Sequence, residues 1–232
     1  MSALAGRLAL VTGASRGIGA AIAAALRDAG ATVVRVARTL AAGPHDGMHD
    51  LPCDVGDATA VARLAADVLA RIGTPDIVVN NAGGFGLTPF ERAEPAELAR
   101  QLAVTLVGAF AVARGFLPAM RMRGSGVLVT IGSIADHVAL PENTIYSTTK
   151  YGLRGLHETL AVEYRGTGVR CTLVSPGPTD TTIWDSVDPD NRPGFVPRRA
   201  MLRPADVADA VLFVATRPPH VHVDWLRLGP AL

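Results

Sequence analysis

The chain has 232 residues, of which 49% are hydrophobic and 19% charged, and its formal net charge is +1. This length fits one domain with a substantial core, and this composition excludes a disordered chain. The charge is balanced without a basic block, which argues against nucleic acid as a partner. The sequence contains no run of about 20 apolar residues, so we expect neither a membrane span nor a signal peptide. We therefore expect a cytoplasmic globular protein without membrane contact.

The cysteine and histidine patterns give no sign of a metal or a disulfide. Cys53 and Cys171 are far apart, lack CxxC spacing and fit reduced, buried thiols. The pair His45/His49 and the histidines of segment 220–224 gather no cysteine or glutamate partners. We expect no metal site.

The first apolar run ends in a glycine-rich turn. Residues 12–19 read Thr-Gly-Ala-Ser-Arg-Gly-Ile-Gly, between the run 8–11 and the alanine-rich run 20–26. Gly13 permits a tight turn, and the later glycines let the backbone approach a pyrophosphate at a helix N-terminus. No Lys-Ser or Lys-Thr pair follows, so it is not a Walker loop. The turn predicts the opening of a dinucleotide-binding unit, although an ordinary surface loop has similar composition.

Strand-like and helix-like segments alternate along the rest of the chain. The expected strands cover 8–11, 32–37, 51–54, 76–80, 126–131, 169–174 and 221–228, and the expected helices 20–26, 57–71, 95–122, 144–165 and 204–216. Segment 38–50 is expected to be a polar connection with little room for a helix. Such alternation predicts an α/β fold: a Rossmann-like, doubly wound parallel sheet in a three-layer αβα arrangement, forming a single domain over 1–232.

Two irregular segments follow strand ends, at the sheet edge where open α/β sheets bind ligands. They cover 82–94 and 175–203, and the second holds five prolines. The second is too long for a simple connection, so we expect residues 178–203 to form a lid over a substrate. Its aromatic residues Trp184 and Phe195 would either contact substrate or pack the lid down.

Three polar side chains form a catalytic pattern. Tyr146 and Lys150 are four residues apart on one expected helix, so both project from the same face, and Ser133 ends the preceding strand. By themselves, Tyr146 and Lys150 would also fit an ordinary solvated pair. Together with the glycine turn, the turn Asn80-Asn81-Ala82-Gly83 and the turn Pro176-Gly177, this pattern resembles the short-chain dehydrogenase/reductase family from about residue 8 to residue 214.

The resemblance implies roles for these three residues. Tyr146 would be the general acid/base, Ser133 would orient the substrate oxygen, and Lys150 would grip the nicotinamide ribose. A free phenol titrates near pH 10, too high for efficient exchange near neutrality. We expect the ammonium of Lys150, together with a positive nicotinamide ring, to lower the pKa of Tyr146.

The resemblance also implies a cofactor-binding set. Its members are Gly13, Ser15, Arg16, Gly17, Ile18, Gly19, Arg38, Asp54, Val55, Asn80, Ala82, Gly83, Tyr146, Lys150, Pro176, Gly177 and Thr181. The second strand ends Val36-Ala37-Arg38, without the acid that would repel a 2′-phosphate. Guanidinium groups at Arg16 and Arg38 suit a phosphate dianion, so NADP(H) is expected over NAD(H), unless Arg38 merely faces solvent.

One position departs from the family pattern. Thr105 stands where the family usually has an asparagine that holds a water and links the lysine to bulk solvent. Threonine cannot present separate amide carbonyl and NH₂ groups. Three outcomes follow: a relay through the Thr105 hydroxyl or a second water, slower proton exchange, or a binding protein with weak turnover. We favour the first, because the proton-donating trio is intact.

The sequence therefore predicts a reversible NADPH-dependent reductase of a small to medium carbonyl compound. One alternative is a 3-oxoacyl thioester reductase of fatty-acid type. Another is a weakly catalytic cofactor-binding regulator or scaffold, which only Thr105 supports. The apolar tail 225–230 could pack on a neighbouring subunit, and the family resemblance implies a homodimer or homotetramer.

Overall fold

The aliphatic runs of the sequence form a sheet with layers of helices on both faces. The computed structural model describes residues 2–231, and its eight strands are ordered β3-β4-β2-β1-β5-β6-β7-β8. Their bounds are β1 Leu8–Thr12, β2 Thr32–Ala37, β3 Gly43–His45, β4 Met48–Pro52, β5 Ile77–Asn80, β6 Gly126–Ile131, β7 Val169–Pro176 and β8 Trp225–Leu228. All neighbouring pairs are parallel except β3 and β4. The predicted doubly wound fold is confirmed.

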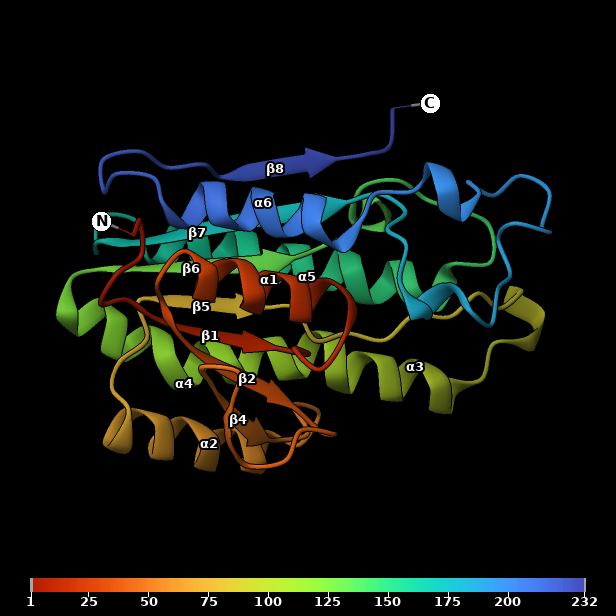
Figure 1. Ribbon diagram of the computed structural model, residues 1–232. Coiled ribbons are helices and arrows are strands. Elements are labelled where there is room, and N and C mark those ends of the chain that lie inside the picture. Colours follow the sequence, from red (N-terminus) through yellow and green to blue (C-terminus); the bar gives the residue numbers. More distant parts are fainter. Residues whose placement is uncertain (1, 232) are drawn as a thin grey trace.

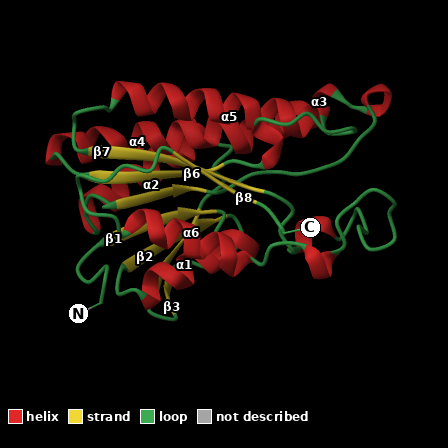
Figure 2. Cartoon of the chain, turned by 90° about the horizontal axis from the view of Figure 1, so that it is seen from above, coloured by secondary structure: helices red, strands yellow, loops and turns green. Residues whose placement is uncertain are grey.

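Two separate apolar clusters join the helices to the sheet. On one face, α1 (Gly17–Asp28) and α6 (Pro204–Ala215) pack against alternate residues of β1 such as Ala9 and Val11. On the other, α2 (Ala58–Arg71) and α4 (Gly108–Arg123) pack against the intervening Leu10, with α5 (Thr144–Glu163) beside them. Because strand side chains alternate between faces, one apolar strand contributes to both clusters. Figure 2 shows the resulting three layers.

The strand order reverses at β1, which pairs with β2 on one side and β5 on the other. Helices that cross on opposite faces diverge at this point and leave a crevice beyond the carboxyl ends of the strands. In Figure 1 the arrows of β1, β5 and β6 point toward the edge where the lid, coloured cyan to blue, is located. The topology therefore places the glycine turn, the loop after β5 and the lid around one space.

The segment between β2 and α2 differs from the prediction. A polar connection was expected over 38–50, but β3 and β4 form an antiparallel hairpin there, and β4 ends at Pro52 rather than at Asp54. The turn residues Asp46 and Gly47 have φ of 50° and 73°, the left-handed pair that favours a two-residue Asp-Gly hairpin. No helix lies between β2 and β4 in this described stretch, as the short connection predicted.

A buried ion pair fixes β4 against β2. Arg35 on β2 donates two hydrogen bonds, of 2.7 and 2.6 Å, to the carboxylate of Asp50 on β4. Both side chains are largely buried. A bidentate pair with this geometry sets the register, because a shift by one residue would leave a charge buried without a partner.

The long helix predicted over 95–122 is present but contains a wider turn. It consists of α3 (Pro95–Leu102), a π-helical segment η2 (Ala103–Val107) and α4, and it ends at Gly124 with φ 74°. By length and composition alone, Pro95–Arg123 would be able to cross a membrane. Its α4 portion instead buries Val112, Phe116 and Leu117 against the sheet, as the core helix of a globular domain does.

Candidate functional site

A cavity of about 1020 Å³ lies beyond the carboxyl ends of the strands. Its walls come from the glycine turn, the ends of β2 and β4, the loop after β5, the start of α5 and the lid. Of the residues predicted to bind cofactor or act in catalysis, these line it: Gly13, Ser15, Arg16, Gly17, Ile18, Gly19, Arg38, Asp54, Val55, Ala82, Gly83, Ser133, Tyr146, Lys150, Pro176, Gly177 and Thr181. The fold thus gathers residues from almost the whole chain.

The glycine turn fits a pyrophosphate. Gly13 and Gly17 have φ of 66° and 57°, and a Cβ on Gly13 would lie 2.8 Å from the Cα of Ala82. A Cβ on Gly19 would lie 2.3 Å from the carbonyl oxygen of Gly13, so larger residues are excluded there. The α1 N-cap, Arg16, makes no capping hydrogen bond, and the first turn carries no acid. The first N–H groups of α1 are therefore available to an anion.

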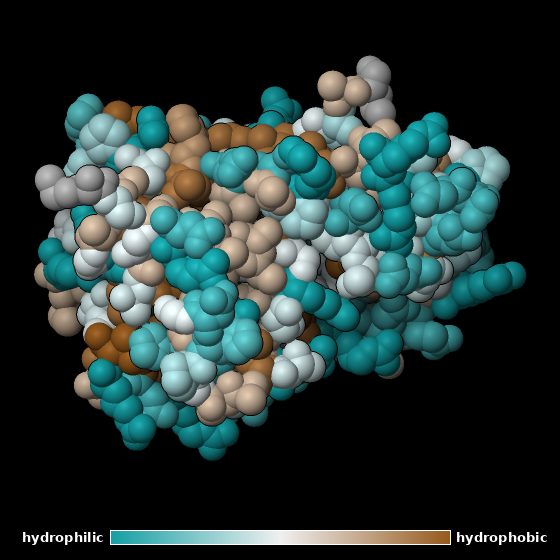
Figure 3. Space-filling model, in the orientation of Figure 1, coloured by the Kyte–Doolittle hydropathy of each residue, from teal (hydrophilic) through white to brown (hydrophobic). Residues whose placement is uncertain are grey.

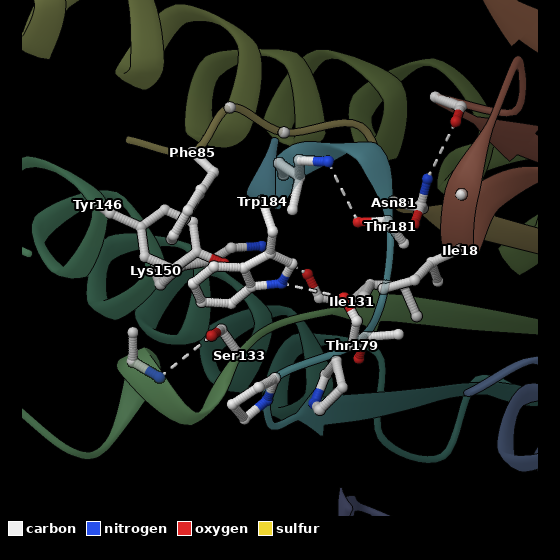
Figure 4. Close-up of a pocket in the computed structure, with 18 of the residues that line it drawn as sticks. Ile18, Asn81, Phe85, Ile131, Ser133, Tyr146, Lys150, Thr179, Thr181 and Trp184 are labelled. Atoms are coloured by element: carbon white, nitrogen blue, oxygen red, sulfur yellow. Dashed lines mark hydrogen bonds between the residues drawn. The ribbon is translucent and has the colours of Figure 1, made fainter. Parts of the chain in front are cut away.

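Asn81, rather than Asn80, supports this turn. The Asn81 amide donates to the carbonyl oxygens of Thr12 (2.8 Å) and Gly13, and the Thr12 hydroxyl accepts from the backbone N–H groups of Asn81 and Ala82 (Figure 4). Asn80 is buried away from the cavity, where its amide donates to the carbonyl of Ala109. The sequence predicted a cofactor-binding role for Asn80 and included Asn81 only as part of a turn. Nothing in the local sequence pattern indicates which of the two neighbouring asparagines supports the glycine turn.

The end of the cavity near β2 is basic. Arg16 and Arg38 both line it and are exposed, and within residues 2–231 neither forms an ion pair. Asp54 lies nearby, but one of its carboxylate oxygens already accepts from the backbone N–H of Gly56 at 2.9 Å. An anionic group entering here would meet two guanidinium groups without competing partners.

The three residues of the predicted catalytic pattern, called the trio below, lie together in the cavity. Lys150 donates from Nζ to the carbonyl oxygen of Ile131 at 2.9 Å, and its Nζ lies 5.7 Å from the centre of the Tyr146 ring. The Ser133 hydroxyl oxygen accepts from the backbone N–H of Ala135, which leaves its own hydrogen free to donate. Figure 4 shows Ser133, Tyr146 and Lys150 around one space. The turn that follows β6 supplies Ser133, and the first turns of α5 supply Tyr146 and Lys150.

Burial shifts the pKa values of two members of the trio in opposite directions. Removal from water raises the pKa of Tyr146 to about 12, while the neighbouring Ser133 hydroxyl lowers it and the charge of Asp136 raises it. Removal from water lowers the pKa of Lys150 to about 8, against the charge of Asp136. The lowering of the Tyr146 pKa expected from Lys150 is therefore not achieved by the protein alone, because desolvation is the larger effect.

A fully buried carboxylate lies directly behind the trio. Asp136 accepts from the backbone N–H of Ser133 at 3.0 Å and from the Ser175 hydroxyl at 2.6 Å, and its other oxygen lies 2.6 Å from Nδ1 of His137. The Trp225 indole in turn donates to Ser175. Ser133 and Asp136 form a capping box at the start of a short helical turn, η3 (Ile134–Asp136). The Ser-x-x-Asp spacing was a detectable signal for this contact, but the prediction did not use it.

Thr105 lies in the π-helical segment and is buried outside the cavity lining. Its hydroxyl accepts from the backbone N–H of Gly84 at 3.3 Å. A Cβ built on Gly83 would lie 3.4 Å from the Thr105 hydroxyl oxygen and 3.8 Å from Nζ of Lys150. The hydroxyl and the ammonium therefore lie within 4 Å of the same point beside Gly83, which has no side chain there.

Segment 178–203 covers the other end of the cavity. Thr179 and Leu202 form a parallel bridge that closes its base, and Arg198 donates to Asp180 (2.9 Å) and Asp185 (2.6 Å). Trp184 lies in the short helical turn η4 (Thr182–Trp184) and, like Phe195, lines the cavity. Phe85, from the loop after β5, also lines it; the sequence analysis missed this residue, because a lone aromatic in a loop carries no periodic signal.

Known proteins resemble this chain in sequence and in architecture. A sequence model described as short chain dehydrogenase matches residues 7–192. A D-threitol dehydrogenase of Mycolicibacterium smegmatis is 36% identical over 224 residues, which cover 91% of this chain and 86% of that protein.

Solved structures agree. A metagenomic short-chain oxidoreductase in complex with NADP has a TM-score of 0.82 at 34% identity, covering 100% of both chains. A gluconate 5-dehydrogenase from Burkholderia cenocepacia in complex with NADP and tartrate has a TM-score of 0.86 at 26% identity, covering 97% of this chain and 94% of that one. The chain therefore belongs to the short-chain dehydrogenase/reductase family, whose members are oxidoreductases that act on alcohol and carbonyl groups with a nicotinamide cofactor.

Proposed function

We propose that this protein is an NADPH-dependent reductase that converts a carbonyl group to an alcohol, reversibly, with Tyr146 as the general acid/base. The observation that carries this proposal is the convergence of Ser133, Tyr146 and Lys150 on one cavity whose far end holds the glycine cradle. When bound, the reduced nicotinamide supplies the hydride. The protein's own residues supply the proton and hold the oxygen that receives it.

The proton chemistry follows from the surroundings of each group. With a pKa of about 12, Tyr146 is protonated at neutral pH and ready to donate to an oxygen that is gaining charge. Ser133 has a free hydroxyl hydrogen and donates to the same oxygen, which holds it in position. Lys150, held by the Ile131 carbonyl, stabilises the tyrosinate that remains and keeps N–H groups for a ribose hydroxyl.

The reaction class is tested by mixing the protein with NADPH and a panel of carbonyl compounds and following the absorbance of the reduced nicotinamide. The panel includes aldehydes, ketones, an acetoacetyl thioester and, because one relative is named a D-threitol dehydrogenase, a four-carbon polyhydroxyketone. We expect turnover of simple ketones. Turnover of the thioester alone would favour the 3-oxoacyl alternative, and cofactor binding without turnover of any member would favour a regulator or scaffold.

The preference for NADP(H) rests on Arg16 and Arg38. Within the described residues, Arg16 and Arg38 form no ion pair with an acidic residue, so both guanidinium groups are available to a 2′-phosphate. Replacing Arg38 with Ala removes one of them, and we expect the Kd for NADP⁺ to rise about tenfold while the Kd for NAD⁺, which lacks this phosphate, changes little. Calorimetric titration of both cofactors measures the ratio. Arg71→Ala, an exposed arginine on α2, is the matched control and should leave both values unchanged. Equal effects of Arg38→Ala on both cofactors would contradict the assignment.

The position of Thr105 supports a proton relay through its hydroxyl. Thr105→Val removes the hydroxyl and keeps the shape, so we expect kcat to fall by roughly threefold to tenfold, with the Kd for NADP⁺ unchanged. Thr105→Ser keeps the hydroxyl and should retain most of the activity. The loss in the valine variant should be largest at low buffer concentration, where exchange with solvent limits the rate. Equal kcat values for all three proteins would show that this position does not limit proton supply.

A further inference from the structure

Aromatic rings from three separate segments form one wall of the cavity beside the catalytic hydroxyls. Phe85 lies edge-on to Tyr146 with ring centres 5.0 Å apart, and Trp184 lies 4.8 Å from Phe85. Phe195 continues the series at 6.3 Å from Trp184. We call Phe85, Trp184 and Phe195 the aromatic wall. Figure 4 shows Phe85 and Trp184 next to Tyr146, and all of these residues line the cavity.

The aromatic wall is held in place by contacts outside the rings. The Trp184 indole donates to the carbonyl oxygen of Thr179 at 3.0 Å, so the ring is anchored to the base of the lid. The guanidinium of Arg192 stacks over Phe195, 4.7 Å from the ring centre, and forms an ion pair with Glu142 on the opposite rim. Glu142 itself has φ of 60°, a conformation that costs energy for a residue other than glycine. The rings therefore occupy defined positions rather than a loose apolar cluster.

Several polar side chains nearby already make hydrogen bonds or ion pairs within the protein. Asn143 is buried and donates to the carbonyl of Pro141 at 2.9 Å, and the Thr179 hydroxyl donates to the carbonyl of Gly177 at 3.0 Å. Glu142 is paired with Arg192. In the described part of segment 178–203, two further hydroxyls line the cavity: that of Thr181 accepts from the backbone N–H of Ile183 and keeps its own hydrogen free, and that of Thr182 makes no hydrogen bond to the protein. A substrate with several hydroxyl groups would lose its water contacts here and gain few replacements.

We propose, on the basis of the function proposed above, that the substrate is a carbonyl compound bearing a flat apolar group, such as an aryl ketone or aryl aldehyde. Its oxygen would meet Ser133 and Tyr146, and its ring would pack against Phe85 and Trp184 in the edge-to-face or offset arrangements that aromatic pairs prefer. The outer surface around the lid is largely hydrophilic in Figure 3, whereas the three apolar rings line the cavity.

The first experiment compares kcat/KM for 1-phenylethanone and for 1,3,4-trihydroxybutan-2-one with NADPH. Because each hydroxyl buried without a partner costs binding, we expect the aryl ketone to be preferred by at least ~100-fold. Trp184→Ala should lower kcat/KM for the aryl ketone by about tenfold, mainly through KM, by removing one face of the pocket. Phe213→Ala, which removes an exposed ring on α6 away from the cavity, is the control and should change neither substrate.

The second experiment separates this inference from the proposed function. Binding of 1-phenylethanone to the complex of the protein with NADP⁺, a pair that cannot react with each other, should quench tryptophan fluorescence, and the quench should be lost in Trp184→Phe but kept in Phe213→Ala. Tyr146→Phe removes turnover without removing this binding. Saturable quenching without turnover would support the apolar site while contradicting the reductase function. Preferred turnover of the polyhydroxyketone, or absence of Trp184-dependent quenching, would overturn the inference.

Discussion

Tyr146→Phe should reduce kcat for carbonyl reduction by roughly a thousandfold, because it removes the one hydroxyl of the trio that can give up its proton completely to the substrate oxygen. The phenyl ring keeps the packing against Phe85, so the cavity should retain its shape. The Kd for NADP⁺ should change by less than about threefold, since Lys150 and the glycine cradle remain. Stopped-flow absorbance of the reduced nicotinamide measures the chemical step, and titration calorimetry measures the binding.

Tyr151→Phe provides the matched control for this result. Tyr151 lies on the same helix α5, and its side chain is partly exposed at the surface. Removing its hydroxyl makes the same chemical change outside the cavity, so activity should stay within twofold of the unmodified protein. If Tyr146→Phe retained more than a tenth of the activity, Tyr146 would not be the acid, and a water held by Ser133 would have to take that role.

Asp136→Asn should move the alkaline limb of the pH profile to lower pH. Lys150 has a pKa of about 8, so its ammonium is present below that pH and lost above it, and kcat/KM for reduction should be constant below pH 8 and fall above it. The charge of Asp136 raises this pKa. Removing the charge should therefore lower the pKa of Lys150 and shift the limb by roughly one pH unit.

Loss of the buried carboxylate should also loosen Ser133. Asp136 holds the backbone N–H of Ser133 at 3.0 Å, and a weaker contact would displace the hydroxyl that orients the substrate oxygen. We expect kcat to fall by about tenfold on the plateau below the limb as well. The Tyr146 pKa would fall too, but from about 12, so Tyr146 stays protonated across the measured range. Rate measurements between pH 5.5 and 9.5 separate the two effects.

Ser175→Ala is the control that keeps the charge. It removes the 2.6 Å hydrogen bond to Asp136 but leaves the carboxyl group itself in place. Activity should drop modestly at every pH, and the limb should stay where it is in the unmodified protein. An identical shift in both variants would show that the position of the limb depends on packing rather than on the charge of Asp136.

Local signals in the sequence were sufficient for the parallel part of the sheet and most helices, and they singled out Ser133, Tyr146 and Lys150 as candidate catalytic residues. The glycine turn of residues 12–19 predicts a strand, a cradle and a helix because each glycine meets a steric limit that the structure shows at Gly13 and Gly19. The spacing of Tyr146 and Lys150 fixes their common face because one helical turn separates them. Aliphatic runs such as residues 77–79 of β5 predict buried parallel strands for the same local reason.

The hairpin formed by β3 and β4 and the buried position of the Asp136 carboxylate could not be predicted without the tertiary structure. Segment 43–52 contains the turn pair Asp46-Gly47, but its flanking residues do not alternate between apolar and polar, and the ion pair between Arg35 and Asp50 supplies the register instead. The Ser-x-x-Asp spacing predicts a cap at Asp136, but its burial depends on β7, which brings Ser175 to it from 39 residues away.

The sequence by itself determined the fold class and the candidate site residues, because a strand, a glycine turn and a Tyr-x-x-x-Lys helix are specified by neighbours within a few residues. The tertiary structure decided the environment of that chemistry. It joined Phe85, Trp184 and Phe195 from distant segments, and it buried Tyr146, which raises the pKa of that phenol. Contacts and desolvation depend on the atoms that surround a group in three dimensions, and those atoms come from residues that are far apart in the chain.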